Sequence, residues 1–434
     1  MIIKQGRPID YTSEKWNIQA DYKGCDVRYK YLLSVENNSR QVISITCANE
    51  KIEVSVNFDA KETPLKLTGF PADFSDVSIL LCNTQNRIAL YINGVLQDED
   101  WPIGKVALSD SVCGFAFGDW TIHDDFSFDR NYRGASAAIT NIQHWRPDGH
   151  DTGVGDCMPF SHGDTFHLFY LFDRRGHRSK WGLGAHQWAH ISTKDFINWT
   201  QRPMAVSIDE QYEGSICTGS VVFNKGLYYA FYAVRMSDGS PARLSWATST
   251  DCINFVKSNK FFELSSRYHT PSARDPIVVI DENGVAHMFV TTSIYAKENG
   301  NPKGCLAHLI SRDMQGWEET EPIVILDTQD QPECPDYFYH NGWYYLIYSI
   351  RGAARYFMSK DPFGPWDVPE NNIIIHENCR VPKTAKLGKD RIMAAGFIVD
   401  PPERGYAGYV VFNEMLQQPD GTFKFVVPAE LCDT

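Results

Sequence analysis

The second part of the chain repeats itself, and this repeat constrains the fold more than any other feature of the sequence. Aromatic, strand-like runs recur at a spacing of roughly 50–60 residues, which is the length of one four-stranded propeller blade. Each run is followed by a turn that contains serine and aspartate and ends near an aromatic residue. The runs are Phe166-His167-Leu168-Phe169-Tyr170, Tyr228-Tyr229-Ala230-Phe231-Tyr232, His287-Met288-Phe289-Val290 and Trp343-Tyr344-Tyr345-Leu346-Ile347-Tyr348.

A fifth, weaker run of the same kind begins at Ile392 and ends at Phe397. About 300 residues at this period predict roughly five blades. The sequence therefore predicts an all-β protein in which residues 139–434 form a five-bladed β-propeller. A large β-sandwich with chance similarity between its hairpins is the alternative architecture.

Residues 1–138 lack the repeat and are predicted to form a separate β-sandwich of the jelly-roll type. The segment Arg87–Asp98 has the pattern of a hairpin, with Asn93-Gly94 as a type I′ turn between two strands. This hairpin resembles that of concanavalin-like modules of the laminin-G type. The sequence leaves three roles open for this domain: it binds a glycan, covers one face of the propeller, or mediates dimerisation.

Composition excludes several classes of protein. The formal net charge of -13 argues against a nucleic-acid partner, since such proteins carry a basic excess. The 11 cysteines include no CxxC pair, so neither a structural zinc site nor a disulfide framework is expected. We predict no metal, no cofactor and no membrane partner. Because Met1–Pro8 has no apolar leader, we expect a cytoplasmic protein. We expect it to be a monomer or a homodimer.

Three acidic residues stand in distinctive settings beside strand-like runs. Asp156 lies in Gly155–Phe160, Asp275 lies between Arg274 and Pro276, and Glu333 lies between Pro332 and Cys334. If they occupy equivalent positions at the starts of blades, they converge on one central channel. Cleavage of a glycosidic bond needs two carboxyl groups in a cleft, so the combination predicts a glycosidase site. Arg274 is expected to keep the neighbouring Asp275 ionised.

Each acidic residue also has a plainer interpretation when it is taken alone. Asp156 has the setting of a turn cap, Asp275 that of a structural residue at the start of a strand, and Glu333 that of an exposed loop residue. The combination of the three favours function over these alternatives.

Several motifs resemble those of glycoside hydrolase family 32, which contains the β-fructofuranosidases. The stretch Trp181–Trp199 is similar to the WG…HWGHAxSxDLxxW signature of that family, and Cys217–Ser220 to its FSGS segment. Residues 274–276 match its RDP motif, and residues 333–336 match its ECPD motif. Asp156 lies about ten residues before an HLFY strand, as the aspartate of the family's NDPNG motif does. The resemblance covers roughly residues 140–431.

The resemblance implies a propeller with a funnel-shaped pocket and a retaining reaction through a covalent fructosyl-enzyme. It implies that Asp156 is the nucleophile, Glu333 the general acid/base and Asp275 the stabiliser of the transition state. Motif positions and exposed aromatic faces supply the predicted substrate-binding residues. These are Arg274, Trp181, Gln187, Ser220, Trp145 and Tyr337.

The sequence departs from the family's pattern mainly around the proposed nucleophile. Gly155 stands where the family has asparagine, and Cys157 stands where it has proline. Ala273, Cys217 and Gln187 also differ from their motifs. Because these positions shape the sugar pocket, we expect an altered subsite.

Other chemistries fit some of the same residues. Cys157 and Cys334 flank the carboxylates, but a cysteine nucleophile needs a paired histidine that the sequence does not indicate. His186 and His190 have the spacing of helical metal ligands, yet the segment is strand-like. The basic run 174–180 is either a solvated loop or a rim that attracts an anionic substrate such as a phosphorylated disaccharide.

The leading interpretation is therefore a retaining hydrolase of β-fructofuranosides, with a small carbohydrate as its substrate. A fructosyltransferase or difructose-anhydride enzyme and an arabinofuranosidase-like propeller hydrolase are alternative enzymes. A non-catalytic carbohydrate-binding protein is the alternative outside catalysis, and the altered motif around Asp156 is its main support.

Overall fold

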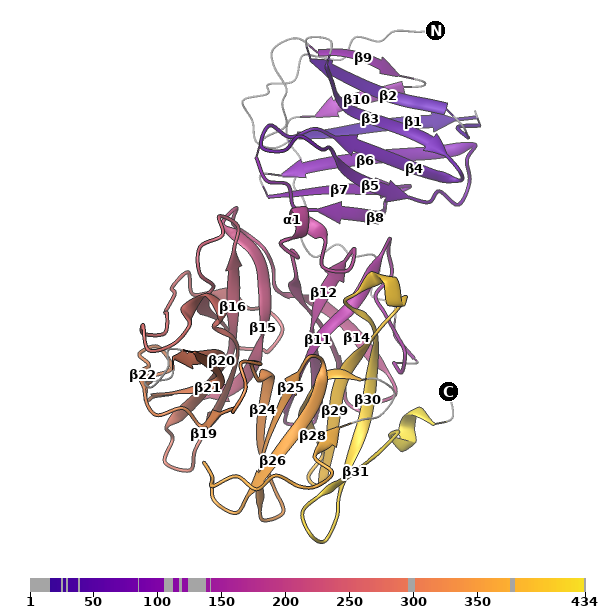
Figure 1. Ribbon diagram of the computed structural model, residues 1–434. Helices are drawn as coiled ribbons and strands as arrows, with labels where there is room; N and C mark the ends of the chain where they lie inside the picture. Colours follow the sequence, from indigo (N-terminus) through magenta and orange to yellow (C-terminus); the bar gives the residue numbers. More distant parts are fainter. Residues whose placement is uncertain are drawn as a thin grey trace.

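The structure is a computed structural model of the 434-residue chain. It describes residues 16–24, 26–28, 30–37, 40–84, 86–104, 112–116, 119–123, 138–140, 142–295, 301–374 and 379–432. Figure 1 shows a smaller β-domain above a larger one. Helical turns are confined to α1 (Ser179–Gly182) and to 3-10 segments at Thr270–Ser272, Pro402–Arg404 and Ala429–Leu431 within these residues. The prediction of an all-β protein is confirmed.

The smaller domain consists of two five-stranded sheets, with strand orders β10-β1-β6-β7-β8 and β5-β4-β3-β2-β9. The predicted hairpin is confirmed as β7 and β8, and both turn residues have positive φ, 50° at Asn93 and 77° at Gly94, as a type I′ turn requires. The strands are β1 (Trp16–Lys23), β2 (Lys30–Asn37), β3 (Arg40–Ala48), β4 (Lys51–Val56), β5 (Leu65–Gly69), β6 (Asp76–Thr84), β7 (Arg87–Ile92), β8 (Val95–Asp100), β9 (Val112–Ala116) and β10 (Asp119–His123).

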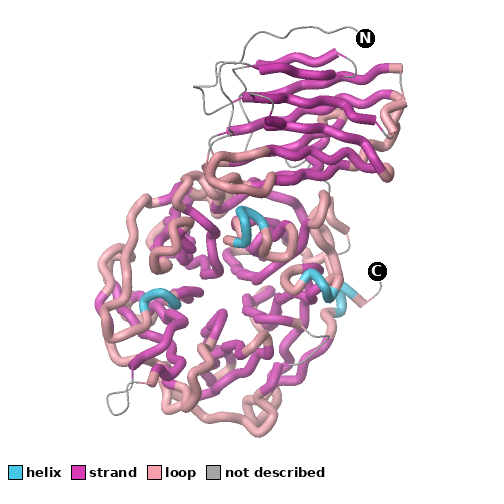
Figure 2. The backbone as a smooth tube through the Cα atoms, turned by 45° about the horizontal axis from the view of Figure 1, so that its top comes forward, coloured by secondary structure: helices cyan, strands magenta, loops and turns pink. Residues whose placement is uncertain are grey.

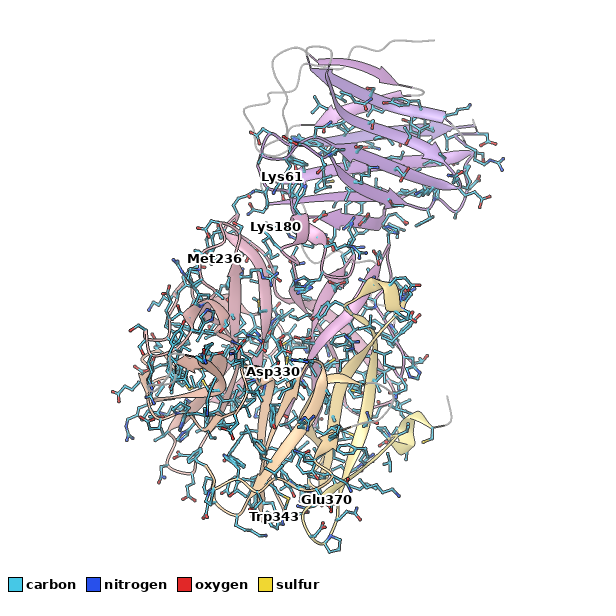
Figure 3. All side chains as sticks on the ribbon, viewed as in Figure 1. Lys61, Lys180, Met236, Asp330, Trp343 and Glu370 are labelled. Carbon is cyan, nitrogen blue, oxygen red and sulfur yellow. The ribbon has the colours of Figure 1, made fainter. Side chains whose placement is uncertain are left out.

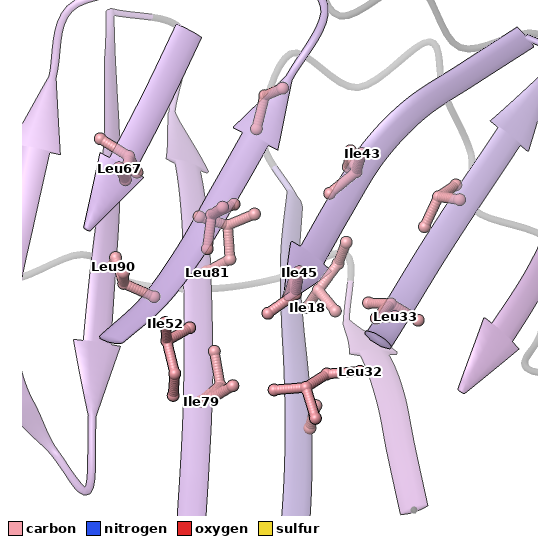
Figure 4. Packing of buried hydrophobic residues seen from close by; sticks show 14 of the residues in the cluster. Ile18, Leu32, Leu33, Ile43, Ile45, Ile52, Leu67, Ile79, Leu81 and Leu90 are labelled. Carbon is pink, nitrogen blue, oxygen red and sulfur yellow. The ribbon is translucent and has the colours of Figure 1, made fainter. Parts of the chain in front are cut away.

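The core of this sandwich comes from alternate residues of the facing strands. In β4, Ile52, Val54 and Val56 are buried while the residues between them are half-exposed, which is the period-2 pattern of a strand with one inner face. Figure 4 shows Ile18 and Ile45 within this cluster. The resemblance to concanavalin-like modules stays a prediction, as does the domain boundary at 138/139, next to residues 124–137, which lie outside the described part.

The larger domain consists of five antiparallel blades arranged around one axis (Figure 2), and the pairing of Val154 in β11 with Gly408 in β30 joins the first and fifth blades into one eight-stranded sheet. The five-bladed propeller is therefore confirmed, and the predicted aromatic runs lie in the second strand of each blade. The first blade contains β11 (Thr152–His162), β12 (Thr165–Arg174), β13 (Gln187–Thr193) and β14 (Trp199–Val206), and the second β15 (Glu213–Asn224), β16 (Leu227–Met236), β17 (Arg243–Ser249) and β18 (Val256–Lys257).

The third blade contains β19 (Arg274–Ile280), β20 (Ala286–Tyr295), β21 (Pro302–Ser311), β22 (Glu318–Glu319) and β23 (Val324–Ile325), and the fourth β24 (Glu333–His340), β25 (Trp343–Ile350), β26 (Ala353–Ser359) and β27 (Ile373–Ile374). The fifth contains β28 (Arg380–Leu387), β29 (Arg391–Val399), β30 (Gly408–Gln417) and β31 (Phe423–Val426). Each blade is thus built from one continuous stretch of chain.

The repeated turn has a common hydrogen-bond pattern. In the first three blades an aspartate (Asp195, Asp251 and Asp313) accepts a hydrogen bond from the Ser or Thr hydroxyl two residues before it. The same carboxylates accept backbone N–H groups two and three residues further on, at distances of 2.8–2.9 Å. Such side-chain bonds replace the backbone partners that a tight turn lacks, so this turn recurs with the blade.

The segment before the first blade closes the ring. Ile139 pairs with Trp199 in the outer strand of the first blade. A few residues later, the His144 N–H donates to the Val410 carbonyl oxygen over 2.9 Å, and the Val410 N–H donates to the Trp145 carbonyl oxygen over 2.9 Å. This segment therefore joins the first blade to the fifth.

The innermost strand of every blade carries the same bulge. Each inner strand advances three residues while its neighbour advances two. The shifts lie between Val154 and Cys157, Ile216 and Gly219, Arg274 and Ile277, Glu333 and Asp336, and Arg380 and Lys383. A bulge bends its strand and redirects the unpaired residues. The five bulges surround the axis and set the position of the site.

Gly219, at the end of the second bulge, is required by close packing. A Cβ atom at this position would lie 1.8 Å from the Phe231 carbonyl oxygen. We predict that Gly219→Ala lowers the free energy of unfolding by about 3 kcal/mol, because the backbone has to move. Urea unfolding measures the change, and Gly316→Ala is the matched control, since its nearest contact would be 3.7 Å away. Equal effects of both substitutions would contradict this interpretation.

Candidate active site

A cavity of about 520 Å³ opens at the bulges and is lined by Asp156, Asp275 and Glu333. The structure thus brings together the three acidic residues that the sequence singled out. They do not occupy equivalent positions, contrary to the expectation from the sequence. Glu333 is the last paired residue before the bulge of its strand, Asp275 the first unpaired residue and Asp156 the second unpaired residue. The backbone of the bulge is the same in each blade, but each of these three blades carries its carboxylate at a different position of the bulge.

Two hydroxyls and a thiol orient the carboxylate of Asp156. The Tyr406 hydroxyl donates to Oδ1 over 2.9 Å, the Thr218 hydroxyl donates to Oδ2, and the Cys334 Sγ lies 3.4 Å from Oδ2. Burial raises the pKa of Tyr406 well above its usual range, so its hydroxyl stays protonated and remains a donor. Gly155 permits this approach, because a Cβ atom there would lie 2.6 Å from the Tyr406 hydroxyl oxygen. This close contact explains why the larger side chain of the family's motif is absent at this position.

Asp275 is buried and accepts the Cys334 N–H over 2.9 Å. Burial raises the pKa of its carboxyl to about 6, although the Arg274 guanidinium, with Nε 3.7 Å from Oδ2, opposes the shift. A carboxyl with a pKa of about 6 is still mostly ionised at pH 7, so the expectation of an ionised Asp275 is not contradicted. Loss of hydration at Asp275 outweighs the charge of its neighbour.

Arg274 links two of the carboxylates. Its Nη2 donates to Glu333 Oε1 over 2.9 Å, and its Nη1 donates to the Ser272 carbonyl oxygen over 2.9 Å. The Glu333 side chain is 37% exposed, so it remains accessible from the cavity. Together, Arg274 and Cys334 contact all three carboxylates, and Arg274 offsets the repulsion between Asp275 and Glu333.

The other residues predicted to bind substrate lie outside the described lining of the cavity, and their side chains make structural contacts instead. Trp181 packs edge-on against Phe58 of the sandwich, with ring centroids 5.9 Å apart, and Trp145 packs against Tyr170 at 6.1 Å. Tyr337 stacks on Phe363 at 6.3 Å. The sequence assigned these residues from motif position and from the affinity of aromatic faces for sugars, whereas in the structure their rings pack against other aromatic side chains.

Gln187 and Ser220 hold backbone groups in place. Gln187 Oε1 accepts the Ile208 N–H over 3.0 Å, and the Ser220 hydroxyl donates to the Pro276 carbonyl oxygen over 3.1 Å. In the segment Cys217–Ser220 the side chain that reaches Asp156 belongs to Thr218. The bulge directs the buried Thr218 side chain to the cavity, whereas Ser220 follows the bulge and bonds to the next blade.

The basic run 174–180 is not a free rim for an anionic substrate. Arg175 Nη2 donates to Asp98 Oδ2 over 2.6 Å, and Arg174 Nη2 donates to Glu99 Oε1 over 3.2 Å, both in the sandwich. Lys180 Nζ donates to the Glu213 carbonyl oxygen over 2.6 Å. The two guanidinium groups are thus engaged at the junction between the domains, and the Lys180 ammonium is engaged within the propeller; the sequence pattern indicated neither arrangement.

Sequence reasoning missed several residues that line the cavity, namely Tyr406, His177, His186, Arg235 and Arg380. One of them had a usable signal. Arg380-Val381-Pro382 repeats the pattern of Arg274-Asp275-Pro276, and Val381 and Asp275 both have positive φ, 42° and 54°. Tyr406 lies in a loop with no motif, so only the fold identifies it.

Two alternative chemistries find no support. Burial raises the pKa of the Cys157 and Cys334 thiols well above the usual range, which disfavours a thiolate nucleophile. His186 and His190 are engaged separately, with Asp173 at 2.9 Å and with His167 at 3.0 Å. Within the described ranges, no cluster of three or more His, Cys, Asp or Glu residues could hold a metal ion, and no helix has the length and apolar character of a membrane span.

The sequence profile described as "Glycosyl hydrolases family 32 N-terminal domain" matches residues 158–380, just over half of the 434 residues. The chain belongs to glycoside hydrolase family 32. The matched stretch contains Arg274, Asp275 and Glu333 but begins two residues after Asp156. The first acidic motif therefore lies partly outside the matched stretch, whereas the second and third lie within it.

Known relatives of this family 32 chain match only part of their own length. The sucrose-6-phosphate hydrolase of Bacillus subtilis (strain 168) is 27% identical over 200 residues, which is 43% of this chain and 39% of the relative. The chain spans about two fifths of the length of such curated relatives.

Solved structures share the fold. Fructan 1-exohydrolase IIa of Cichorium intybus (E201Q, in complex with 1-kestose) has a TM-score of 0.53 at 16% identity, over 65% of this chain and 59% of that one. A structure titled RS223-Beta-xylosidase has a TM-score of 0.52 at 16% identity, over 64% and 96% of the two chains. Both likenesses concern the propeller fold alone.

The raised pKa of Asp275 predicts a specific pH dependence of stability. The buried carboxyl binds its proton up to about pH 6 in the folded protein and to about 3.8 when unfolded. As the pH rises between these values, the wild type loses about 3 kcal/mol of unfolding free energy, whereas Asp275→Asn does not. Urea unfolding of both proteins at pH 4 and pH 7 measures this difference. A difference that is the same at both pH values would contradict the burial of a titrating carboxyl here.

Proposed function

We propose that this chain hydrolyses β-fructofuranosidic linkages with retention of configuration. The observation that carries the proposal is the convergence of Asp156, Asp275 and Glu333 in one cavity of a family 32 propeller. The printed names of the curated relatives, sucrose-6-phosphate hydrolases, support the same class of substrate.

In this proposal Asp156 attacks the anomeric carbon and forms a covalent fructosyl-enzyme. The hydroxyls of Tyr406 and Thr218 fix the two oxygens of the nucleophile before substrate binds. Fixed donors of this kind reduce the reorganisation that the reaction needs. Retention requires the carboxyl groups of Asp156 and Glu333 to lie about 5–5.5 Å apart in the complex.

Glu333 acts as the general acid and then as the general base. It first protonates the leaving oxygen, and it then accepts a proton from the water that cleaves the fructosyl-enzyme. In the free protein its Oε1 accepts a hydrogen bond from Arg274, which leaves Oε2 for the glycosidic oxygen. Asp275, which lines the same cavity as Asp156 and Glu333, stabilises the positive charge that develops on the sugar ring and binds fructosyl hydroxyls.

Substitution of the two reacting carboxylates tests the assignment. We expect Asp156→Asn and Glu333→Gln each to lower kcat by on the order of a thousandfold or more, because each removes a reacting group. The assay is release of monosaccharide from sucrose, sucrose 6-phosphate, fructooligosaccharides, levan, difructose anhydrides and arabinan oligomers. Asp327→Asn, whose side chain is 98% exposed, is the control and should retain wild-type activity.

Each result of this screen has a distinct meaning. Wild-type activity in either carboxylate variant would contradict the assignment, and products with inverted configuration would contradict the retaining mechanism. Turnover of arabinan oligomers alone would indicate the arabinofuranosidase-like alternative. Elongated products would indicate a fructosyltransferase, and binding without turnover would indicate a carbohydrate-binding protein.

We further propose that the substrate carries an anionic group such as phosphate. Arg235 and Arg380 line the cavity and are exposed, and they come from the second and fifth blades, which flank the first. Among the described residues neither guanidinium has an ion-pair partner, whereas Arg274 and Arg404 do. Arg235 Nη1 lies 2.9 Å from His177 Nε2, which holds it at the cavity.

The two arginines predict a difference between substrates. We expect Arg235→Gln and Arg380→Gln each to lower kcat/KM for sucrose 6-phosphate about tenfold and for sucrose less than about twofold, because a charge-assisted hydrogen bond is lost only with phosphate. Arg312→Gln, a change at an exposed arginine of the third blade, is the control. Equal losses with both substrates would show that the arginines do not recognise the phosphate.

A further inference from the structure

We propose that the N-terminal sandwich is a positioning part of the active site. Its edge strand β8 fixes the first-blade loop of residues 175–185, and this loop holds one wall of the cavity against Asp156. The catalytic consequence rests on the proposed function, whereas the positioning itself does not.

The first step is the attachment of the loop to the sandwich. Arg175 binds Asp98 Oδ2 over 2.6 Å through Nη2 and the Glu99 carbonyl oxygen over 2.9 Å through Nη1. The Lys180 N–H donates to Asp100 Oδ1 over 2.7 Å. The side chains of Asp98 and Glu99 are fully buried at this junction. Buried carboxylates need charged partners, so the sandwich edge and the loop stabilise each other.

The tip of the loop also packs on the sandwich. Lys180 and Trp181 have φ of 51° and 52°, a conformation that non-glycine residues rarely adopt without tertiary support. The Trp181 ring packs against Phe58, and Lys61 Nζ lies 5.7 Å from the ring centroid. Figure 1 shows α1 between the two domains, and Figure 3 labels Lys180 and Lys61 at the same junction.

The second step joins the loop to the fifth blade through Asp173, which is fully buried. Its carboxylate accepts the Gly176 N–H over 2.9 Å and the His177 N–H over 2.7 Å. The same carboxylate contacts His186 Nε2 at 2.9 Å and forms an ion pair with Arg404. Asp173 thus holds both ends of the loop and the segment that precedes Tyr406.

The third step reaches the proposed nucleophile. Arg404 Nε donates to the Tyr406 carbonyl oxygen over 3.1 Å, and the Tyr406 ring lies 5.1 Å from the His186 ring and 5.6 Å from the His177 ring. The hydroxyl of the same tyrosine donates to Asp156 Oδ1. The loop that β8 fixes therefore forms the support on which Tyr406 rests. Asp98, Arg175 and Asp173 are positioning residues that act through Tyr406 and His177.

Full-length variants on each side of the junction test this inference. The changes are Asp98→Asn in the sandwich and Arg175→Gln in the loop, and Asp173→Asn serves as a positive comparison. The matched control is the ion pair of Asp164 and Lys194, also in the first blade, with a 2.8 Å separation and side chains 73% and 71% exposed. Asp164→Asn and Lys194→Gln remove this pair away from the cavity.

Two measurements are made on each variant. Hydrogen–deuterium exchange of the free protein is expected to rise in residues 176–186 and also in the peptides that contain Tyr406 and Asp156. With whichever fructoside the wild type cleaves, kcat is expected to fall about tenfold while KM changes less than about threefold, because the aim of the nucleophile is altered more than the binding surface. The control variants should change neither quantity.

The outcomes separate this inference from the proposed function. Faster exchange confined to residues 176–186, or unchanged kcat in the Asp98 and Arg175 variants, would overturn the positioning role. If Asp98→Asn fails to fold, Arg175→Gln, on the propeller side, decides the question. If the wild type cleaves no fructoside, the proposed function fails, and the spread of exchange to Tyr406 and Asp156 still decides whether the sandwich positions the cavity.

Discussion

The cavity depends on the bulge that interrupts the innermost strand of each blade. In a regular strand the side chains alternate between the two faces of the sheet, and in a propeller both faces are packed against neighbouring blades. A regular inner strand would bury every side chain between blades. The bulges at Asp156, Thr218 and Asp275 release residues from that alternation and direct them to the axis. The chemistry of the site is therefore set by the residues that each blade places at its bulge and directly before it, where Arg274 and Glu333 lie.

Acidic groups that lie close together in one cavity repel one another, and two residues offset this repulsion. Arg274 places a guanidinium between Asp275 and Glu333, and Cys334 donates its N–H to Asp275 while its thiol faces Asp156. These contacts do not fully offset the loss of hydration at Asp275, where burial still raises the pKa of the carboxyl to about 6. This residual cost is typical of functional sites, where stability is lower than packing alone would allow.

The sequence was most informative for features that depend only on residues close together in the chain. The aromatic runs and their Ser/Thr-x-Asp turns predicted the blades, because the same hydrogen bonds recur in the turns of the first three blades. The acidic motifs identified residues that do meet in the cavity. The sequence failed for contacts between distant segments, since no local pattern shows that Arg175 binds Asp98 or that Tyr406 reaches Asp156. The aromatic residues assigned to sugar binding lie outside the lining of the cavity, and tryptophan and tyrosine also suit a packed core.

The closure of the ring affects when the site comes into existence. Asp156 lies in the first blade and Tyr406 in the fifth, 250 residues later, and the segment 139–145 holds these blades together. During synthesis Asp156 is therefore made well before Tyr406, the residue that orients it. A nascent or truncated chain that lacks the fifth blade has the carboxylates without the geometry that aims Asp156. The site is complete only when the fifth blade has packed against the first.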